Sequence, residues 1–216
     1  MKPVFTIGHS LHEMEAFIDL LRRHGIEAVA DVRSHPYSKR LPQFSKAELQ
    51  RALKAAGIQY VFLGQELGAR RNERDCYVDA QAKYELIARL PAFAEGIERI
   101  QSGAARMNLS LMCAEKDPIT CHRTILVCRE LARLGLDVKH ILDDGRLELH
   151  EDAQKRMMIE EGFVPGQLDI FGGDDDSGSL TLAYEKRGLK IAYREIDGVE
   201  DGEDEIIHDR IHTEVG

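Results

Sequence analysis

Short apolar segments alternate with amphipathic helical patterns along most of this 216-residue chain, and this alternation is the strongest constraint on its fold. Apolar, strand-like runs occur at residues 4–7, 26–32, 58–63, 109–112 and 138–142. Helical periodicity covers residues 11–24, 45–56, 78–90 and 91–101, a stretch that ends near residue 135, and residues 150–161. Such alternation is typical of a parallel sheet with helices on both faces. We therefore predict an α/β fold with a mostly parallel, Rossmann-like sheet of about five strands.

Two serines precede predicted helices and are expected to cap them. Ser10 stands directly before the helix at 11–24. Ser45 stands before the helix at 45–56, with Glu48 three residues later in the pattern of a capping box. Both helices should therefore begin at these serines.

The composition changes after residue 162, which predicts three parts. Residues 1–162 form the α/β domain, residues 163–179 are Gly- and Asp-rich and predict a flexible linker, and residues 180–216 form a small acidic extension with a short helix and strand. The net charge is −9, of which residues 172–216 contribute −8 through 13 acidic and 5 basic residues. The α/β domain is therefore almost neutral.

Basic residues of the domain cluster at 33–40 and 70–74. Such clusters are most often solvated loops, and they are also what a nucleic-acid contact requires, so both interpretations stay open. No apolar run approaches the roughly 20 residues that cross a bilayer. We expect a cytoplasmic protein without membrane contact, in which the four cysteines are reduced thiols.

Reactive and charged side chains follow strand after strand in this sequence. Because parallel strands end at one edge of a sheet, their side chains should meet there. The candidates for catalysis are Cys121, Cys113, His122, His9, Asp31 and Glu115, and the candidates for binding an anion are Ser10, Arg33, Ser38 and Arg123.

The two cysteines nearest this edge are expected to differ. Cys121 lies in the first turn of a predicted helix, where the helix dipole and Arg123 would stabilise a thiolate, so Cys121 is the better candidate nucleophile. Cys113 ends a strand and can equally be a small buried residue. Cys128 lies among apolar residues and is assigned to the core.

A metal ion is a second interpretation of the same residues. Cys113, Cys121, His122 and His9 are ligand types that zinc accepts, but the seven-residue gap between the cysteines is not the usual close spacing. Zinc is therefore possible and not favoured. A disulfide between the cysteines is disfavoured in a reducing compartment.

Arg33 and Arg123 can bind an anion in two ways. Their guanidinium groups can hold a phosphate or carboxylate of a ligand by two hydrogen bonds. They can instead form buried ion pairs within the protein, for example with Asp31 and Glu115, which are also possible acid/base groups. We favour the ligand-binding interpretation because both arginines are expected at one edge.

The domain carries a set of short motifs and single residues: Gly8-His9-Ser10, Asp31-Val32-Arg33 with Pro36 and Ser38, Phe44, Tyr60 with Leu63-Gly64, Leu67-Gly68, Cys113-Ala114-Glu115 and Cys121-His122-Arg123. In this combination they are specific, and over about residues 3–142 the chain resembles the domain of unknown function 488 family. The resemblance implies a soluble α/β domain of prokaryotic type with cysteines suspected of function. It implies no reaction.

A five-residue segment after the domain resembles the peptide by which bacterial DNA polymerases and repair proteins bind the sliding clamp. It consists of Gln167, Leu168, Asp169, Ile170 and Phe171 and is flanked by glycines. An extended peptide of this kind can bury its apolar side chains in a groove of a partner. The same side chains can instead pack on the domain.

These features together favour an enzyme that acts on DNA or a nucleotide, in repair or base modification, and is recruited by the sliding clamp. Two alternatives remain open. One is a non-catalytic module that binds a phosphate group or a metal ion at the same edge. The other is a thiol enzyme that acts on a small molecule unrelated to DNA.

Overall fold

A parallel sheet forms the centre of the molecule in the computed structural model, which describes residues 2–164 and 176–195. Within these residues the main sheet has six strands in the order β3-β2-β6-β1-β7-β8, of which only the edge strand β8 is antiparallel. The predicted α/β fold is confirmed, with six strands instead of about five. The strands are β1 (Val4–Gly8), β2 (Ala28–Asp31), β3 (Gln59–Phe62), β6 (Leu109–Cys113), β7 (Val138–Ile141) and β8 (Leu147–Leu149).

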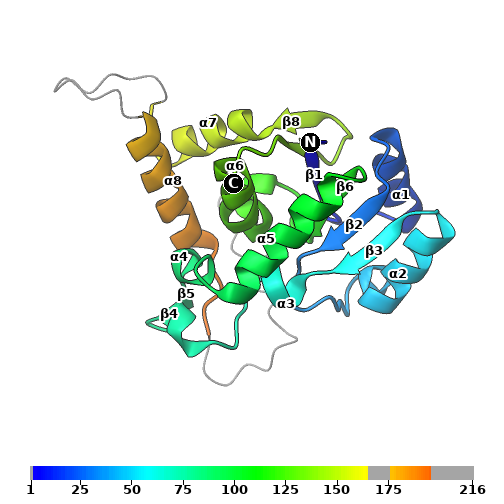
Figure 1. Cartoon of the computed structure of the whole chain (residues 1–216), viewed down its shortest axis with the longest axis horizontal. Helices are drawn as coiled ribbons and strands as arrows, with labels where there is room; N and C mark the ends of the chain where they lie inside the picture. The colour runs from blue at the N-terminus through cyan, green and yellow to red at the C-terminus, as the bar shows by residue number, and fades with distance from the viewer. Residues whose placement is uncertain (1, 165–175, 196–216) are drawn as a thin grey trace.

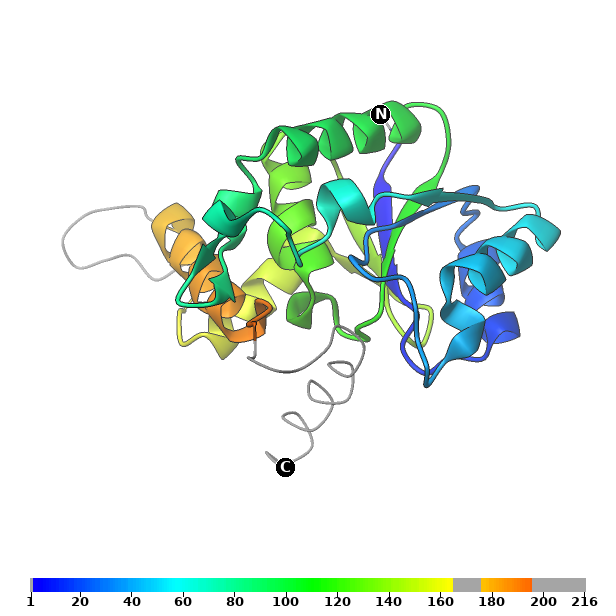
Figure 2. The ribbon, with the colours of Figure 1, turned by 90° about the horizontal axis from the view of Figure 1, so that it is seen from below.

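Helices cover both faces of this sheet (Figures 1 and 2). One hydrophobic cluster joins α1 and α2 to one face through residues such as Phe17 and Leu49. A second joins α5, α6 and α7 to the other face through residues such as Ile97, Leu131 and Met157. The helices are α1 (Met14–Arg23), α2 (Lys46–Ala55), α3 (Gly64–Leu67), α4 (Tyr84–Ile87), α5 (Pro91–Ala104), α6 (Arg129–Arg133), α7 (His150–Glu160) and α8 (Asp176–Ile191).

The central strands β1 and β6 are buried along their whole length. Parallel strands with helices on both sides need apolar side chains on both faces, and this accounts for the nearly continuous apolar runs in the sequence. Gly8 at the end of β1 lies opposite Cys113 at the end of β6. The centre of the sheet therefore ends where the reactive residues begin.

The helix predicted at residues 78–90 is wrong over most of its length. Strands β4 (Tyr77–Val78) and β5 (Gln81–Ala82) form a small hairpin there, followed by the single turn α4. Asp79 and Ala80, between the strands, both have positive φ angles, as a tight hairpin turn demands. Neither residue is a glycine, so the usual sequence signal for such a turn is missing.

The expected helix caps also differ from the structure. Helix α1 begins at Met14 instead of residue 11, and Ser10 adopts a φ of 47° before it, so Ser10 does not cap the helix. Ser45 does occupy the N-cap of α2, but its side chain makes no capping hydrogen bond. The Ser45 hydroxyl instead donates to the carbonyl of Ser38, 3.4 Å away. The predicted capping box is therefore absent from this helix.

Helix α8 begins inside the segment expected to be a linker and packs against α7. A buried chain of hydrogen bonds links it to the sheet: Tyr184 to His150 at 3.1 Å, His150 to His140 at 3.1 Å, and His140 to Thr6 at 2.8 Å. Burial lowers the pKa of His150 to about 4 and lowers the pKa of His140 as well, so both histidines are neutral in this series of hydrogen bonds.

The clamp-like segment, residues 167–171, lies outside the described residues. None of the helices at 2–164 and 176–195 is both long and apolar enough for a membrane crossing.

Candidate cysteine-histidine site

The carboxyl ends of β1, β2 and β6 lie side by side and bring three of the sequence motifs together. Strand β6 pairs with β1 on one side and β2 on the other. Beyond the paired residues, the His9 amide donates to the Cys113 carbonyl at 2.9 Å and the Val32 amide donates to the Met112 carbonyl at 3.1 Å. The loops after these strands therefore start from fixed backbone positions.

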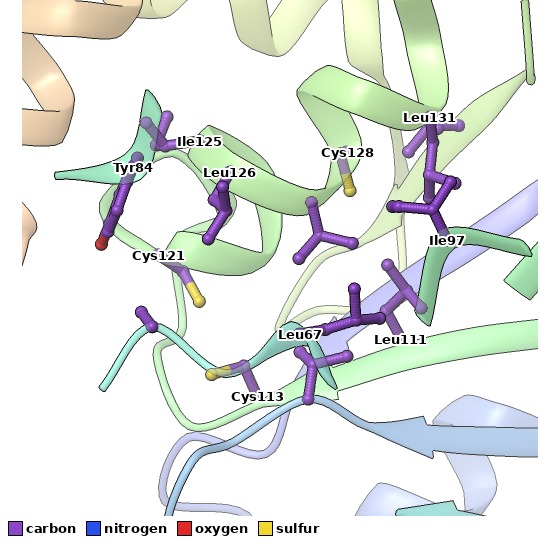
Figure 3. Packing of buried hydrophobic residues seen from close by; sticks show 14 of the residues in the cluster. Leu67, Tyr84, Ile97, Leu111, Cys113, Cys121, Ile125, Leu126, Cys128 and Leu131 are labelled. Carbon is purple, nitrogen blue, oxygen red and sulfur yellow. The ribbon is translucent and has the colours of Figure 1, made fainter. Parts of the chain in front are cut away.

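Two thiols and one imidazole meet at this edge. The ligand atoms of Cys113, Cys121 and His122 all lie within 4.8 Å of one another. His122 Nδ1 is 3.7 Å from the Cys113 sulfur and 3.9 Å from the Cys121 sulfur. Both cysteines are buried, and the two sulfurs lie in the gap between β6 and the helical segment that follows Cys121 (Figure 3). All four cysteines of the chain are free thiols.

The other nitrogen of His122 fixes how the ring faces the thiols. His122 Nε2 lies 3.0 Å from the Val32 carbonyl oxygen, which can only accept a hydrogen bond. Nε2 therefore carries a proton and donates to Val32. Nδ1 is left facing the two sulfurs.

The loop between the two cysteines is folded back by a short 3₁₀ turn, Pro118–Thr120. Asp117 caps this turn by accepting from the Ile119 amide at 3.1 Å, and both of its carboxylate oxygens pair with Arg156 of α7 at 2.8 and 2.9 Å. This turn returns the chain to β6. Cys121 follows it and precedes a π-helix, Arg123–Cys128, instead of lying in the first turn of an α-helix. π-helical segments are rare and are frequent at functional sites.

The expectation that Cys121 is the more acidic thiol is not supported. Burial, together with the hydrogen bond and the charge of Cys113, raises the pKa of Cys121 well above its ordinary value. Burial also acts to raise the pKa of Cys113, but the hydrogen bond from Cys121 and the charge of His122 outweigh it and lower this pKa to about 7. Burial alone would lower the pKa of His122, whereas the Cys113 thiolate raises it to about 9. The contact of Cys113 with His122 therefore favours the thiolate form of Cys113.

Glu115 lies beside the thiols, as expected for a residue of the same loop. Burial acts to raise its pKa, but the charge of His122 and hydrogen bonds from the thiols of Cys121 and Cys113 lower it below the ordinary value. Its Oε2 atom is buried and has no hydrogen-bond partner within the described part of the chain. A buried carboxylate oxygen without a partner is costly.

Arg123 is fully buried and supports the loop. Its Nη1 donates to the Glu115 carbonyl at 2.7 Å and its Nη2 donates to the Lys116 carbonyl at 3.3 Å. The predicted role of Arg123 as an anion contact stays a prediction, and in this structure its Nη atoms bond the backbone of the loop. The alternative, an ion pair of Arg123 with the Glu115 carboxylate, is not seen either, because Arg123 donates to the backbone carbonyl of Glu115.

Arg33 forms the buried ion pair that the sequence left as an alternative. Its Nε and Nη2 atoms donate to the two oxygens of Asp31 at 2.9 and 2.7 Å, and Nη2 also donates to the Phe44 carbonyl at 2.9 Å. Tyr60 donates to the same Asp31 carboxylate at 2.9 Å. Asp31 and Arg33 thus neutralise each other, and the anion-binding interpretation of Arg33 stays a prediction.

His9, Ser10 and Ser38 belong to the surroundings of that ion pair. His9 stacks on Phe44 with ring centroids 4.3 Å apart, and its Nε2 lies 3.4 Å from Arg33 Nη1. Burial and then the charge of Arg33 lower the pKa of His9 to about 4, so His9 is neutral. The Ser10 amide donates to the Ala114 carbonyl at 2.9 Å, and the Ser38 hydroxyl accepts from the Leu41 amide at 3.0 Å. These residues shape the loops beside the cysteines.

The basic residues at 70–74 mostly make ion pairs and ring contacts within the protein. Arg71 pairs with Glu73 at 2.7 Å and Arg74 pairs with Glu195 at 2.6 Å. Arg70 lies over the ring of Tyr193, 4.6 Å from its centroid. These pairs weaken the interpretation of residues 70–74 as a nucleic-acid contact.

Three contributors to the site were not assigned from the sequence. The Val32 carbonyl orients His122, and a backbone atom has no sequence signal. Tyr60 holds Asp31, and its place on the strand β3, which pairs with β2, could have suggested this contact. Gly8 allows the Glu115 carbonyl to approach β1, since an added Cβ would lie 1.9 Å from that oxygen.

The fold and the edge together define an α/β domain whose central parallel strands bring two thiols and an imidazole to their carboxyl ends. The profile of a family described as "Domain of unknown function DUF488" matches residues 13–129, more than half of the chain, and the chain belongs to this family. The match includes Asp31, Arg33, Cys113, Glu115 and Cys121–Arg123 and begins after His9 and Ser10. Among curated proteins and among solved structures, no match was found.

Proposed function

We propose that the protein is an enzyme that acts on DNA or a nucleotide, and that its reacting groups are Cys113, Cys121, His122 and Glu115. The convergence of two thiols and an imidazole within 4.8 Å carries this proposal. Thiols beside a histidine are the groups that nucleophilic and metal-assisted transfer reactions use. Glu115 adds a carboxylate for proton transfer. We place this enzyme in the cytoplasm, where its four thiols stay reduced.

The choice of DNA or a nucleotide as substrate depends on the clamp-like segment, since the basic residues at 70–74 are engaged within the protein. Residues 167–171 have the sequence pattern of a short extended peptide with three apolar anchors. A clamp-bound enzyme would be held at replicating DNA, which suits repair or base modification.

Serine in place of Cys113 or of Cys121 is expected to reduce turnover of a DNA or nucleotide substrate by about 100-fold or more, because each change removes a reacting thiol. Turnover is measured by mass spectrometry of single-stranded and double-stranded oligonucleotides and of free nucleotides after incubation with the protein. Circular dichroism reports whether each variant is folded.

Cys128→Ser is the matched control, because Cys128 is an equally buried thiol in the adjacent π-helix. Its turnover should stay within a few-fold of the wild type. Wild-type turnover in both Cys113→Ser and Cys121→Ser would remove the thiols from the mechanism. Turnover of small thiol-reactive substrates but of no nucleic acid would replace DNA with a small molecule as the substrate.

A pull-down with purified bacterial sliding clamp tests the recruiting peptide. The full chain should bind the clamp, and Leu168→Ala combined with Phe171→Ala should weaken binding by at least about tenfold, because both apolar anchors are lost. Leu182→Ala is the control, since Leu182 is an exposed leucine of α8 outside the segment. Equal clamp binding by wild type, the double variant and the control would break the link to replicating DNA.

A further inference from the structure

We propose that Cys113, Cys121 and His122 bind a zinc ion through the two sulfurs and Nδ1, and that a water molecule in the fourth position lies against Glu115. The metal would make the site a hydrolytic centre. This inference concerns the same residues as the proposed enzyme. Its substrate class rests on that proposed function, whereas the metal site does not.

The two sulfur–nitrogen separations fit a tetrahedral zinc ion. Zinc–sulfur and zinc–nitrogen bonds of about 2.3 and 2.05 Å at tetrahedral angles place sulfur and nitrogen roughly 3.6 Å apart. His122 Nδ1 lies 3.7 Å from the Cys113 sulfur and 3.9 Å from the Cys121 sulfur. His122 Nδ1 is therefore close to ligand spacing from both sulfurs, and the two sulfurs lie within 4.8 Å of each other.

The orientation of His122 is the one that metal-binding histidines adopt. Such histidines donate their second nitrogen to a carboxylate, a backbone carbonyl or water, which fixes the tautomer and directs the first nitrogen at the metal. His122 Nε2 is hydrogen bonded to the Val32 carbonyl at 3.0 Å. Nδ1 thus faces the two thiols from a fixed ring.

The fold explains how two cysteines that are far apart for a usual zinc site can still bind one ion. Seven residues separate Cys113 from Cys121, more than in the usual close pairs. The Pro118–Thr120 turn, held by the ion pair of Asp117 with Arg156, returns the chain so that the sulfurs meet. The two cysteines are therefore brought together by the folded loop after β6 and not by a close pair in the sequence, as in a zinc knuckle.

Charge balance is also satisfied when a cation is bound. Zinc binding converts both thiols to thiolates, and the ion with two thiolates is neutral. The remaining charges nearby are the Glu115 carboxylate and the buried guanidinium of Arg123, which hold opposite signs. The complete site would bury no net charge, which is the condition for burying ions without a large cost.

Glu115 is placed as a proton acceptor and not as a ligand. It is absent from the group of atoms that lie within 4.8 Å of one another, yet its Oε2 is buried and lacks a partner within residues 2–164 and 176–195. A metal-bound water can give a proton to Glu115, after which its oxygen bonds to the electrophilic atom of the substrate. The bond between that electrophilic atom and the leaving group then breaks, the leaving group takes the bonding electron pair, and Glu115 gives it the proton. Two cysteines and one histidine with a non-ligand glutamate serve zinc-dependent base deamination in the same way.

Metal content of the full chain, purified without chelators, tests the ligands. We expect about one zinc ion per chain in the wild type, and much less in Cys113→Ser, Cys121→Ser and His122→Ala, with affinity weakened by about 100-fold or more. Cys128→Ser is the matched control and should keep the zinc. Glu115→Gln should also keep the zinc and lose turnover, since it removes the proton acceptor and leaves the three ligands.

Cobalt substitution tests the site without any variant. Co²⁺ added to chelator-treated wild type should give thiolate-to-cobalt charge transfer and the visible bands of a tetrahedral ion. An octahedral cobalt spectrum, or zinc content equal in the wild type and Cys113→Ser, would overturn the metal site. Loss of zinc from Glu115→Gln would make Glu115 a ligand and overturn its role. A zinc-loaded chain without turnover would contradict the proposed enzyme and leave the metal site in place. Turnover by a metal-free chain would contradict the role of the metal and leave the proposed enzyme in place.

Discussion

Replacing Gly8 with alanine is expected to destabilise the protein by about 3 kcal/mol or more, because the new methyl group has no space. The added Cβ would lie 1.9 Å from the Glu115 carbonyl oxygen and 2.8 Å from the carbonyl carbon, both of which are backbone atoms. Moving that carbonyl would also lengthen its 2.7 Å hydrogen bond from Arg123. Unfolding by urea, followed by circular dichroism, measures the loss.

The matched control is Gly103→Ala in helix α5. An alanine Cβ there lies 3.4 Å from a terminal carbon of Leu109, which is an ordinary contact with a flexible side chain. Alanine is the better helix former, so this variant should be unchanged or more stable by up to about 1 kcal/mol. Equal stability of Gly8→Ala and the wild type would show that the Glu115 loop moves freely away from β1, and the arrangement of the site would then not depend on Gly8.

The centre of the sheet could be predicted from the sequence because its central strands are buried on both faces. Strands β1 and β6 are apolar nearly throughout, so they were recognised without any knowledge of their neighbours. Strand β8 has only three residues, and Leu147 and Leu149 are exposed, so it has no comparable signal. The β4–β5 hairpin was mistaken for a helix because its turn uses Asp79 and Ala80, whose positive φ angles local sequence rules do not anticipate.

The meeting of the site residues was predictable, whereas their roles were not. Parallel topology alone brings Cys113, His9 and Arg33 to one edge. Which thiol is more acidic depends on how the two sulfurs contact each other and His122, and these contacts cannot be read from residue spacing. The partners of Arg33 and Arg123 likewise depend on which acceptors lie within 3 Å after folding.

Removing the carboxylate of Asp31 is expected to cost about 3–5 kcal/mol, because Asp31→Ala leaves the Arg33 guanidinium buried without its counter-charge. Arg33 is 5% exposed and Asp31 is fully buried, so water cannot replace the lost partner. The hydroxyl of Tyr60 would lose its acceptor at the same time. Urea unfolding of Asp31→Ala against the wild type measures the effect.

The double variant Asp31→Leu with Arg33→Met is the control, since removing both charges leaves neither of them unpaired. The double variant should recover most of the free energy of unfolding that Asp31→Ala loses. Replacing a buried ion pair by apolar residues of similar size often leaves the stability unchanged. Added phosphate separates the two interpretations of Arg33. It should raise the melting temperature of Asp31→Ala by replacing the lost carboxylate, and leave the wild type unchanged because Asp31 already occupies the guanidinium. A wild type that phosphate stabilises as strongly as Asp31→Ala would restore Arg33 as an anion-binding residue of the site.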